Sequence, residues 1–353
     1  MSKIKLLLAS PITDECLSEI KKYCEVNQQI SPENGGPRVF SQEMIEEYSN
    51  HEIIVLSLQD VTDECLHKWH KTGLKLLVCT RGTPVNVPWK TVKELGIMLV
   101  YAPGRNAQAV AEMTIGLILG LTRNIAWASH RIRSGELTGD PVEDIYNIPD
   151  RKDINWIFKD GKRIYDCFEM NYEMQRKNLG IVGFGAIGKK LLHIAKNGFD
   201  MNVLVYDPYV SEETIVQSGG KCCDLDHLLK NSDFVSIHLP VNPETVGSVN
   251  MSWFEKMKPT AFLINTARAS VINQKDIIKA IENNIIAGYA ADVSWIEPIP
   301  ENHPFVDRGN VLLTPHIGAQ VQDIKRHQSE IITSDIIAYC QSKTPKNIWK
   351  RIE

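Results

Sequence analysis

The stretch that most constrains the fold of this chain is a glycine-rich segment near its middle. Gly183, Gly185 and Gly188 fit the pattern G-x-G-x-x-G between an apolar run at 179–182 and a helical pattern at 189–197. In such a turn the first glycine permits a tight bend, the second lets the backbone approach a pyrophosphate, and the third lets the helix pack closely on the sheet. The segment therefore predicts the strand, turn and helix of a dinucleotide-binding unit.

An acidic residue completes this unit. Asp207 directly follows a second apolar run, at 202–206. It lies about 20 residues after the glycine motif, which is the spacing expected of the acid that binds the adenosine ribose hydroxyls. The amides of Ala186 and Ile187 would lie at a helix N-terminus, where unpaired N–H groups and the helix dipole attract phosphate. A glycine-rich turn without a ligand is the alternative. The acid in register favours a dinucleotide, and it favours NAD because the 2′-phosphate of NADP would meet a like charge.

Length and composition favour two domains and a small-molecule ligand. The chain has 353 residues, more than one ordinary core, and a net charge of -4 without acidic or basic blocks, which favours neither disorder nor a nucleic-acid surface. Its eight cysteines lack C-x-x-C spacing, which indicates reduced thiols and no metal site. We find no apolar run long enough for a signal peptide or a membrane span, so we expect a cytoplasmic protein without a membrane partner.

The N-terminal part predicts a small open α/β domain. Thr13 and Thr62 each begin the pentapeptide T-D-E-C-L, and each can cap a helix whose first turn is acidic. Five letters are too few to indicate a duplicated gene, so we interpret them as one structural solution used twice. The expected strands lie at 3–9, 53–58, 74–79 and 97–101.

The loop after the third of these strands is a candidate for contacting a substrate. Arg81, Gly82 and Thr83 follow the strand at its C-terminal end, where open α/β sheets bind ligands. A Gly-Pro turn without a function is the alternative. Arg81 and Arg105 could suit a phosphorylated or polyhydroxylated acid, or each could form a surface ion pair.

A long helix is predicted over residues 107–133, where we place a crossover between domains. Residues 113–121 are apolar nearly all round, so this part is buried in a core or against a second subunit. The segment 135–176 is rich in aromatic and charged residues without clean periodicity, and a connection of this length is functional, interfacial or mobile. The helix and this segment together predict a homodimer.

Beyond the glycine-rich segment, apolar runs again alternate with helical patterns. This alternation predicts a doubly wound parallel sheet. The expected strands lie at 233–239, 261–265, 287–291 and 311–314, and the expected helices at 274–283 and 323–341.

Three short sequences at the ends of these strands suggest chemistry: N-T-A-R at 265–268, D-V-S-W-I-E-P at 292–298 and P-H-I-G at 315–318. Each alone has an ordinary structural explanation. Together with a dinucleotide fold they supply what hydride transfer between NAD(H) and a 2-oxo acid requires. Arg268 can clamp the substrate carboxylate, His316 can exchange a proton with the carbonyl oxygen, and Glu297 can orient His316 and stabilise its charged form.

With these motifs the chain resembles the D-isomer-specific 2-hydroxyacid dehydrogenase family, and most of all its phosphoglycerate and glycerate dehydrogenases. The resemblance covers nearly the whole chain, and it also rests on H-L-P at 238–240 with Glu244 and Thr245. It implies an NAD-dependent oxidoreductase that acts on the CH-OH group of a D-2-hydroxy acid. It further implies a Rossmann doubly wound parallel sheet domain inserted into a smaller flavodoxin-like α/β substrate domain, with the site in the cleft between them. The NAD-binding domain would span 105–317, and the substrate domain 1–104 and 318–353.

The resemblance also implies roles for individual residues. Arg268 would clamp the substrate, Glu297 would pair with His316, and His316 would donate the proton. The backbone amides around Arg81 and Gly82 would hold the substrate carboxylate, and Asp292 would contact the nicotinamide carboxamide. The implied cofactor contacts are Thr83, Gly183, Gly185, Ala186, Ile187, Gly188, Asp207, Thr266, Ala267, Arg268, Asp292, His316 and Gly318.

The chain departs from the family pattern in three places. Ala269 replaces the usual glycine after the arginine, Gln320 and Val321 replace small and hydroxyl residues after the histidine loop, and the segment 135–176 is longer than usual. A different class of function shares this fold, namely dinucleotide-sensing corepressors, which keep the same three residues. The lack of a basic stretch or a low-complexity tail argues mildly against that alternative.

Overall fold

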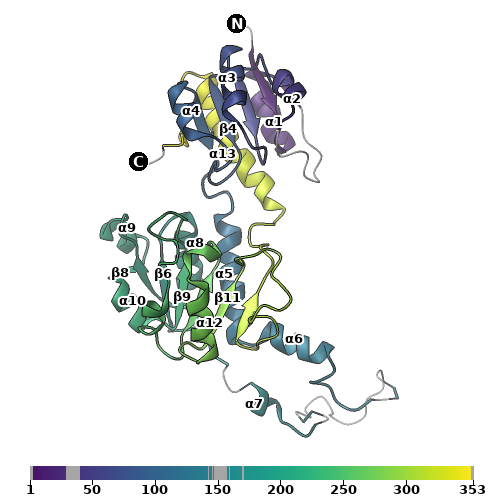
Figure 1. The fold of residues 1–353 in the computed structure, drawn as a ribbon, viewed down its shortest axis with the longest axis vertical. Coiled ribbons are helices and arrows are strands. Elements are labelled where there is room, and N and C mark those ends of the chain that lie inside the picture. Colours follow the sequence, from purple (N-terminus) through teal and green to yellow (C-terminus); the bar gives the residue numbers. More distant parts are fainter. Residues whose placement is uncertain are drawn as a thin grey trace. The chain divides into compact units, whose positions relative to one another are not determined.

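The chain folds into two compact units, which Figure 1 shows as a ribbon of the computed structural model. The first unit comprises Met1–Ala107 and Gln320–Glu353, and the second comprises Gln108–Ala319. The second unit is thus inserted in the sequence of the first. Parts of the segment 135–176 lie outside the described residues, which are 3–28, 40–141, 143–144, 146, 157–158, 160–168 and 171–350.

A parallel five-stranded sheet forms the centre of the first unit, in the order β2-β1-β3-β4-β5. This is the order of flavodoxin-like sheets, as the sequence predicted. Strand β2 was not predicted, because it is an edge strand in which only its first residue, Cys24, is buried, and its composition is polar. The strands are β1 (Ile4–Leu8), β2 (Cys24–Gln28), β3 (Ile53–Leu56), β4 (Leu76–Cys79) and β5 (Met98–Tyr101).

Helices pack on both faces of this sheet. The side chains of Thr13 and Thr62 accept hydrogen bonds from the amides of Cys16 and Cys65, which confirms the two predicted caps. Trp69, fully buried, packs in the core cluster on one face, and Ile332 and Ile336 pack in the cluster on the other. The helices are α1 (Asp14–Lys21), α2 (Gln42–Glu47), α3 (Asp63–Lys71), α4 (Trp89–Glu94) and α13 (Asp323–Cys340).

The second unit contains a parallel seven-stranded sheet in the order β12-β11-β10-β9-β6-β7-β8. Its first six strands in chain order follow the doubly wound dinucleotide-binding arrangement, so the predicted fold class is confirmed. The order reverses beside β6, which places the carboxyl ends of β6 and β9 at the switch point where such sheets bind ligands. The strands are β6 (Asn178–Val182), β7 (Asn202–Tyr206), β8 (Lys221–Cys222), β9 (Phe234–Ile237), β10 (Phe262–Asn265), β11 (Gly288–Ala291) and β12 (Val311–Leu313).

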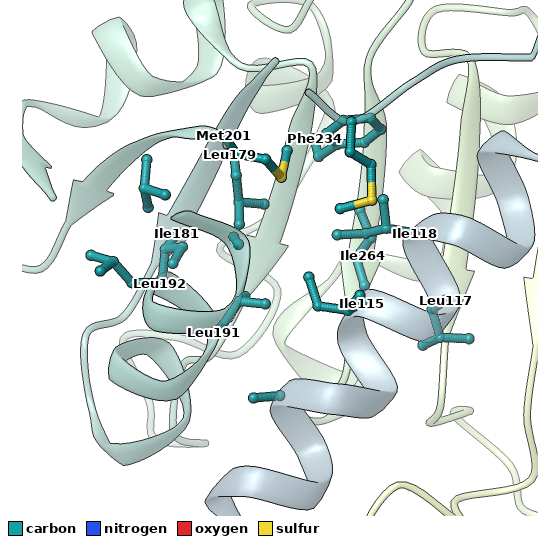
Figure 2. Close-up of a cluster of buried hydrophobic side chains, with 14 of the residues drawn as sticks. Ile115, Leu117, Ile118, Leu179, Ile181, Leu191, Leu192, Met201, Phe234 and Ile264 are labelled. Carbon is teal, nitrogen blue, oxygen red and sulfur yellow. The ribbon is translucent and has the colours of Figure 1, made fainter. Parts of the chain in front are cut away.

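Alternate residues of these strands enter two cores. On one face, Ile115 and Ile118 of α5 pack with Leu179 and Ile181 of β6 (Figure 2). The opposite face packs against α10, α11 and α12. The helices of this unit are α5 (Ala107–Thr122), α6 (Ile125–Arg133), α7 (Ile164–Cys167), α8 (Ala186–Phe199), α9 (Glu212–Gln217), α10 (Leu225–Asn231), α11 (Met251–Phe254) and α12 (Gln274–Glu282).

The single helix predicted over 107–133 is wrong. Two helices, α5 and α6, occupy this stretch at an angle of 60°, because Asn124 adopts the left-handed conformation with φ 52°, which asparagine tolerates better than most residues. Among the described residues, no single helix is both long and apolar enough to cross a membrane, although α5 and α6 taken together reach that length and apolarity.

Candidate active site

The glycine-rich turn joins β6 to α8. Gly183 has φ +94°, and a Cβ there would lie 2.6 Å from the carbonyl oxygen of His238. A Cβ on Gly188 would lie 2.6 Å from the carbonyl oxygen of Gly183. The fold itself therefore requires these two glycines. A Cβ on Gly185 would meet nothing within 4 Å, so a ligand approaching the backbone explains this glycine better than the chain's own packing does.

The start of α8 offers free donors beside Gly185. Gly185 is the N-cap and provides no side-chain hydrogen bond. The amides of Ala186 and Ile187 have no acceptor among the described residues, as is usual for the first turn of a helix. Gly185 and Ala186 are exposed. These donors fit the phosphates of a dinucleotide.

Asp207 lies at the end of β7, next to this turn. Its Oδ2 accepts a hydrogen bond of 2.7 Å from the amide of Phe184, and its Oδ1 accepts one of 2.8 Å from the amide of Tyr209. The carboxylate is therefore fixed beside the glycine-rich turn. Each of its oxygens keeps acceptor capacity for a further donor, such as a ribose hydroxyl.

His238 follows β9 on the other side of the turn. Its Nε2 forms a hydrogen bond of 2.9 Å with the Ser236 hydroxyl, whereas its Nδ1 is buried without a partner among the described residues. Burial lowers the pKa of His238 to about 4, so this imidazole is neutral at pH 7. The motif at 238–240 supported the family resemblance, but nothing in its pattern predicted a buried neutral histidine.

The turn after β10 presents Arg268. Asn265, fully buried, accepts a hydrogen bond of 3.0 Å from the amide of Ala267 and donates one of 3.0 Å to the carbonyl of Arg268. The hydroxyl of Thr266 lies 3.0 Å from that of Thr114 on α5. The Arg268 side chain is exposed and donates to the Ala267 carbonyl at 2.7 Å. Asn265, which fixes this turn, was missed as a site residue although it begins the motif.

Asp292 follows β11 and is 3% exposed. Its Oδ1 accepts hydrogen bonds from the Thr314 hydroxyl at 2.7 Å and the Ile317 amide at 2.9 Å, and its Oδ2 accepts one from the Gly318 amide at 2.8 Å. A Cβ on Gly318 would lie 2.7 Å from that Oδ2, so glycine is required there. Asp292 thus holds the loop after β12 on both sides of His316.

His316 lies in this loop with φ 57°, a left-handed conformation that costs a non-glycine residue on the order of 1–3 kcal/mol. The bonds to Asp292 on either side maintain it. His316 Nδ1 donates to Glu297 Oε2 at 2.9 Å, and Glu297 Oε1 accepts from the Ser294 amide at 3.1 Å. The bond at Nδ1 therefore fixes the orientation of the imidazole ring, and Nε2 is the ring nitrogen that Glu297 does not contact.

Electrostatics keep Glu297 ionised. Burial raises its pKa, but the hydrogen bonds from His316 and the Ser294 amide, together with the charges of His316 and Arg268, outweigh burial and hold the pKa below its ordinary value. The side chains of His316 and Glu297 are 38% and 42% exposed, so a solute can reach them.

The remaining predicted residues belong to the first unit. Arg81, Gly82 and Thr83 follow β4; the first two are half-buried, and Thr83 is exposed. The adjacent Thr80 is fully buried, with its hydroxyl 3.0 Å from that of Ser10. Within the described parts of both units, no group of three or more histidine, cysteine, aspartate or glutamate residues is arranged to hold a metal ion.

Comparison with known proteins shows similarity along almost the whole chain. Residues 115–318 match the family described as D-isomer specific 2-hydroxyacid dehydrogenase, NAD binding domain. A glyoxylate reductase of Thermofilum pendens is 31% identical over 98% of this chain and 94% of its own length. A D-3-phosphoglycerate dehydrogenase of Archaeoglobus fulgidus is 29% identical over 98% of this chain, which spans 59% of that protein's length.

A solved structure supports the fold. The apo form of Rhodotorula graminis D-mandelate dehydrogenase is similar with a TM-score of 0.81 and 21% sequence identity, over 99% of this chain and 98% of that chain.

Proposed function

The chain belongs to the D-isomer specific 2-hydroxyacid dehydrogenase family, and from that premise we propose that it transfers a hydride between NAD(H) and a 2-hydroxy acid/2-oxo acid pair through Arg268, Glu297 and His316. The family and NAD as cofactor, both predicted from the sequence, are confirmed. One observation carries the proposed roles above all others: His316 and Glu297 form a hydrogen-bonded pair on the loops that follow β11 and β12.

The pair can move a proton at a defined atom. Because Glu297 is ionised, it accepts from Nδ1 of His316 and fixes the tautomer. Nε2 is then the nitrogen that gives a proton to the substrate carbonyl oxygen during reduction and takes it back during oxidation. The carboxylate stabilises the imidazolium in the protonated state, as in other histidine–carboxylate pairs.

Arg268 is proposed to bind the reacting carboxylate and polarise the neighbouring carbonyl. Its guanidinium is exposed, and the one bond found for it in the described structure goes to the adjacent Ala267 carbonyl. The planar fork therefore keeps donors for a bidentate contact with a carboxylate. The backbone amides of Arg81 and Gly82 are proposed as further contacts for the same carboxylate.

The residues around the glycine-rich turn fit NAD. The free amides of Ala186 and Ile187 suit the pyrophosphate, the open space beside Gly185 permits its approach, and Asp207 keeps acceptor capacity for ribose hydroxyls. When bound, NADH supplies the hydride. The other cofactor contacts that we propose are Thr83, Gly183, Gly188, Thr266, Ala267, Arg268, Asp292, His316 and Gly318.

The proposed activity is tested by turnover of a panel of 2-oxo acids with NADH, followed at the absorbance of NADH. The panel contains plain and phosphorylated acids of three to five carbons, including glycerate-type and phosphoglycerate-type substrates. Turnover of at least one acid is expected. If the protein binds NADH but turns over none of the acids, the proposed dehydrogenase activity is wrong and a dinucleotide sensor is favoured.

We also propose that the protein is a cytoplasmic homodimer that associates through α6. The apolar residues of α5 are buried within their own unit, so they no longer require a second subunit. On α6, however, Ile125 and Ile132 are 58% and 55% exposed. Trp127 and His130 of the same helix line a hollow of about 650 Å³ that also borders residues 305–309. The eight free thiols support the cytoplasm.

Light scattering tests this assembly. A dimer mass is expected at micromolar concentration, and a monomer mass for a variant carrying Ile125→Glu and Ile132→Glu. A monomeric unmodified protein would overturn the proposal.

A further inference from the structure

Arg105 carries a half-buried positive charge for which the described residues provide no carboxylate partner. It lies just before α5, in the first unit, and its guanidinium donates to the side-chain oxygen of Gln328. Gln328 is 3% exposed, and its amide donates to the Pro11 carbonyl at 2.9 Å. Among the described residues, no carboxylate forms an ion pair with Arg105.

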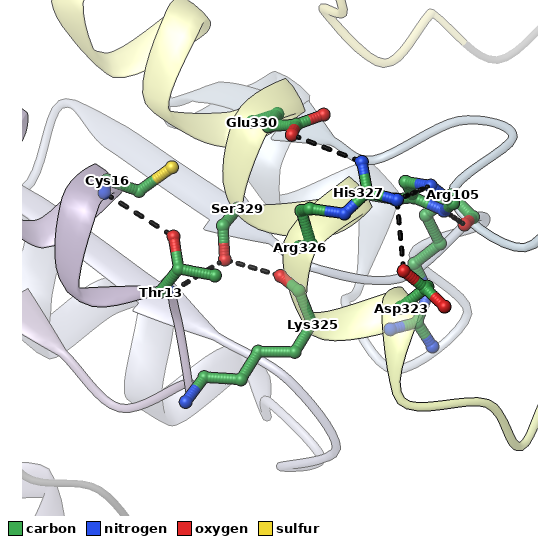
Figure 3. Close-up of polar contacts among 9 residues, drawn as sticks. All are labelled: Thr13, Cys16, Arg105, Asp323, Lys325, Arg326, His327, Ser329 and Glu330. Carbon is green, nitrogen blue, oxygen red and sulfur yellow. Dashed lines mark hydrogen bonds and ion pairs between the residues drawn. The ribbon is translucent and has the colours of Figure 1, made fainter.

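The acids at the start of α13 pair with another arginine. Figure 3 shows Arg105 beside the start of α13, where Arg326 contacts Asp323 at 3.0 Å and Glu330 at 3.5 Å. His327 bonds the backbone carbonyl of Arg105 at 3.2 Å and does not touch its guanidinium. The ion pairs at this end of α13 therefore leave Arg105 unbalanced.

A second arginine increases the local positive charge. The amide of Ala102 donates to the Arg81 carbonyl at 2.9 Å, so the loops after β4 and β5 run side by side. Burial lowers the pKa of Arg105, and the positive charge of Arg81 lowers it further. The polar side chains buried at this edge of the sheet, among them Ser10, Gln59 and Thr80, are neutral.

Two arginines on neighbouring loops, neither with a carboxylate partner among the described residues, are unfavourable by themselves. A half-buried charge loses part of its hydration, and a like charge adds repulsion. An oxyanion between them reverses both effects, since each guanidinium offers several N–H donors in a planar fork that matches carboxylate or phosphate oxygens. The arrangement is that of an anion site rather than of a structural ion pair.

We propose that the side chains of Arg81 and Arg105 bind a second acidic group of the substrate, so that the preferred substrate is a 2-hydroxy acid with a phosphate or a second carboxylate at its far end. This inference rests on the proposed function, because it assigns the anion to the dehydrogenase substrate. The backbone amides of Arg81 and Gly82 remain assigned to the carboxylate next to the reacting carbon. Arg105 is thus a specificity residue and takes no part in proton transfer.

The first experiment measures anion binding without turnover. Inorganic phosphate and, separately, malonate are titrated into the full-length protein, and the melting temperature is recorded. Both anions are expected to raise it in the unmodified protein, and Arg105→Met should weaken the effect by at least about fivefold. Arg326→Met removes an arginine of the same region that already has carboxylate partners, so it should leave the effect unchanged.

The melting temperature without added anion provides a further check on the same variants. Arg105→Met removes an unbalanced charge but also the donor to the buried Gln328 oxygen, so the two effects oppose each other and its melting temperature should stay close to that of the unmodified protein. An Arg105→Met variant that melts lower and still responds fully to both anions would assign Arg105 a structural role and overturn the site.

The second experiment uses matched substrates with NADH. Arg105→Met should lower kcat/KM at least about tenfold for 2-oxo acids that carry a phosphate or a second carboxylate at the far end. It should change kcat/KM less than about twofold for 2-oxo acids of equal length whose far end is uncharged. The phosphorylated and dicarboxylic arms identify which group the site takes. Equal losses of kcat/KM on acids with a charged far end and on acids with an uncharged far end would overturn the inference. Failure of the unmodified protein to reduce any acid would refute the proposed function instead, whatever the anion titration shows.

Discussion

The carboxyl edges of the two parallel sheets are built with opposite chemistry. At the edge of the seven-stranded sheet, carboxylates hold backbone amides: Asp207 holds the glycine-rich turn, and Asp292 holds the loop of His316. At the edge of the five-stranded sheet, neutral groups hold the loops. Gln59 donates to the Ala9 carbonyl, and Asn86 donates to the Gln59 carbonyl.

This difference separates positioning from capture. A carboxylate that accepts two or three hydrogen bonds from backbone amides fixes a loop strongly, and it keeps a negative charge that repels an anionic ligand. Neutral amides and hydroxyls fix a loop without cancelling nearby charge, so Arg81 and Arg105 stay available for an anion. The seven-stranded edge is therefore suited to holding reacting groups in fixed positions, and the five-stranded edge to offering free positive charge to an additional acidic group.

The largest expected effect tests the positioned edge at its reacting group. His316→Ala should lower kcat by about 10²–10⁴-fold, the usual contribution of a positioned acid–base residue. NADH affinity, measured by fluorescence titration, should change little because the glycine-rich turn is untouched. Near-normal turnover in this variant would remove His316 from the chemistry and leave the positioned edge without a proton donor.

A pH titration of stability tests the histidine at the switch point. The pKa of His238 is lowered to about 4 in the folded protein, so between about pH 6.5 and pH 4 the unfolded chain binds a proton that the folded protein does not. The contribution of His238 to the free energy of unfolding is therefore full above about pH 6.5. It falls by about 3 kcal/mol as the pH drops to about 4, and it changes little at lower pH. Urea unfolding at several pH values measures this loss.

Variants connect that loss to His238. His238→Gln should remove most of the dependence, whereas His227→Gln, which alters an exposed histidine on α10, should leave it intact. An unchanged slope in His238→Gln would show that another group causes it.

Much of the fold could be predicted from the sequence because its signals are local. Apolar runs mark the buried strands, and Thr13 and Thr62 mark helix starts. The edge strands β2 and β8 were not predicted because their residues are polar and half-exposed. The break at Asn124 was missed because the apolar pattern alone does not reveal a single left-handed residue.

The candidate site likewise contains residues that motifs reveal and contacts that only the folded chain creates. Arg268, Glu297 and His316 stand in recognisable motifs, so the sequence predicted them together. The bonds from Asp292 to the loop of His316 could not be predicted, because they join residues 22 to 26 positions apart whose distance depends on strand register. The bonds of Asn265 are local, to Ala267 and Arg268, but the motif alone does not reveal that this side chain is buried beneath its own turn. The unbalanced charge of Arg105 likewise depends on which acids lie near it in space, which a motif does not reveal.

Two buried aspartates test whether positioning is specific to the seven-stranded edge. Asp292→Asn should lower the free energy of unfolding by about 1–3 kcal/mol and kcat by about 10- to 100-fold, because the loop of His316 loses its support. Asp335 of α13 is the matched control. It is 1% exposed and accepts from the amides of Lys346 and Asn347.

Asp335→Asn should cost similar stability and leave kcat nearly unchanged. The measurements are urea unfolding and steady-state turnover well below the melting temperature of each variant. Equal losses of kcat in both variants would indicate a general loss of folding rather than a positioning role for Asp292.

The smallest effect concerns cofactor choice at Asp207. Its oxygens already accept the amides of Phe184 and Tyr209, so the charge is held beside the glycine-rich turn, where the 2′-phosphate of NADP would meet it. A preference for NADH of at least tenfold in kcat/KM requires only about 1.4 kcal/mol, which one such repulsion supplies. Asp207→Ala should weaken both cofactors, because the turn loses a bond, and weaken NADH more, because only NADH loses its ribose acceptor. Equal use of NADH and NADPH by the unmodified enzyme would mean that Asp207 only supports the turn, and the edge would then position its loops without selecting the cofactor.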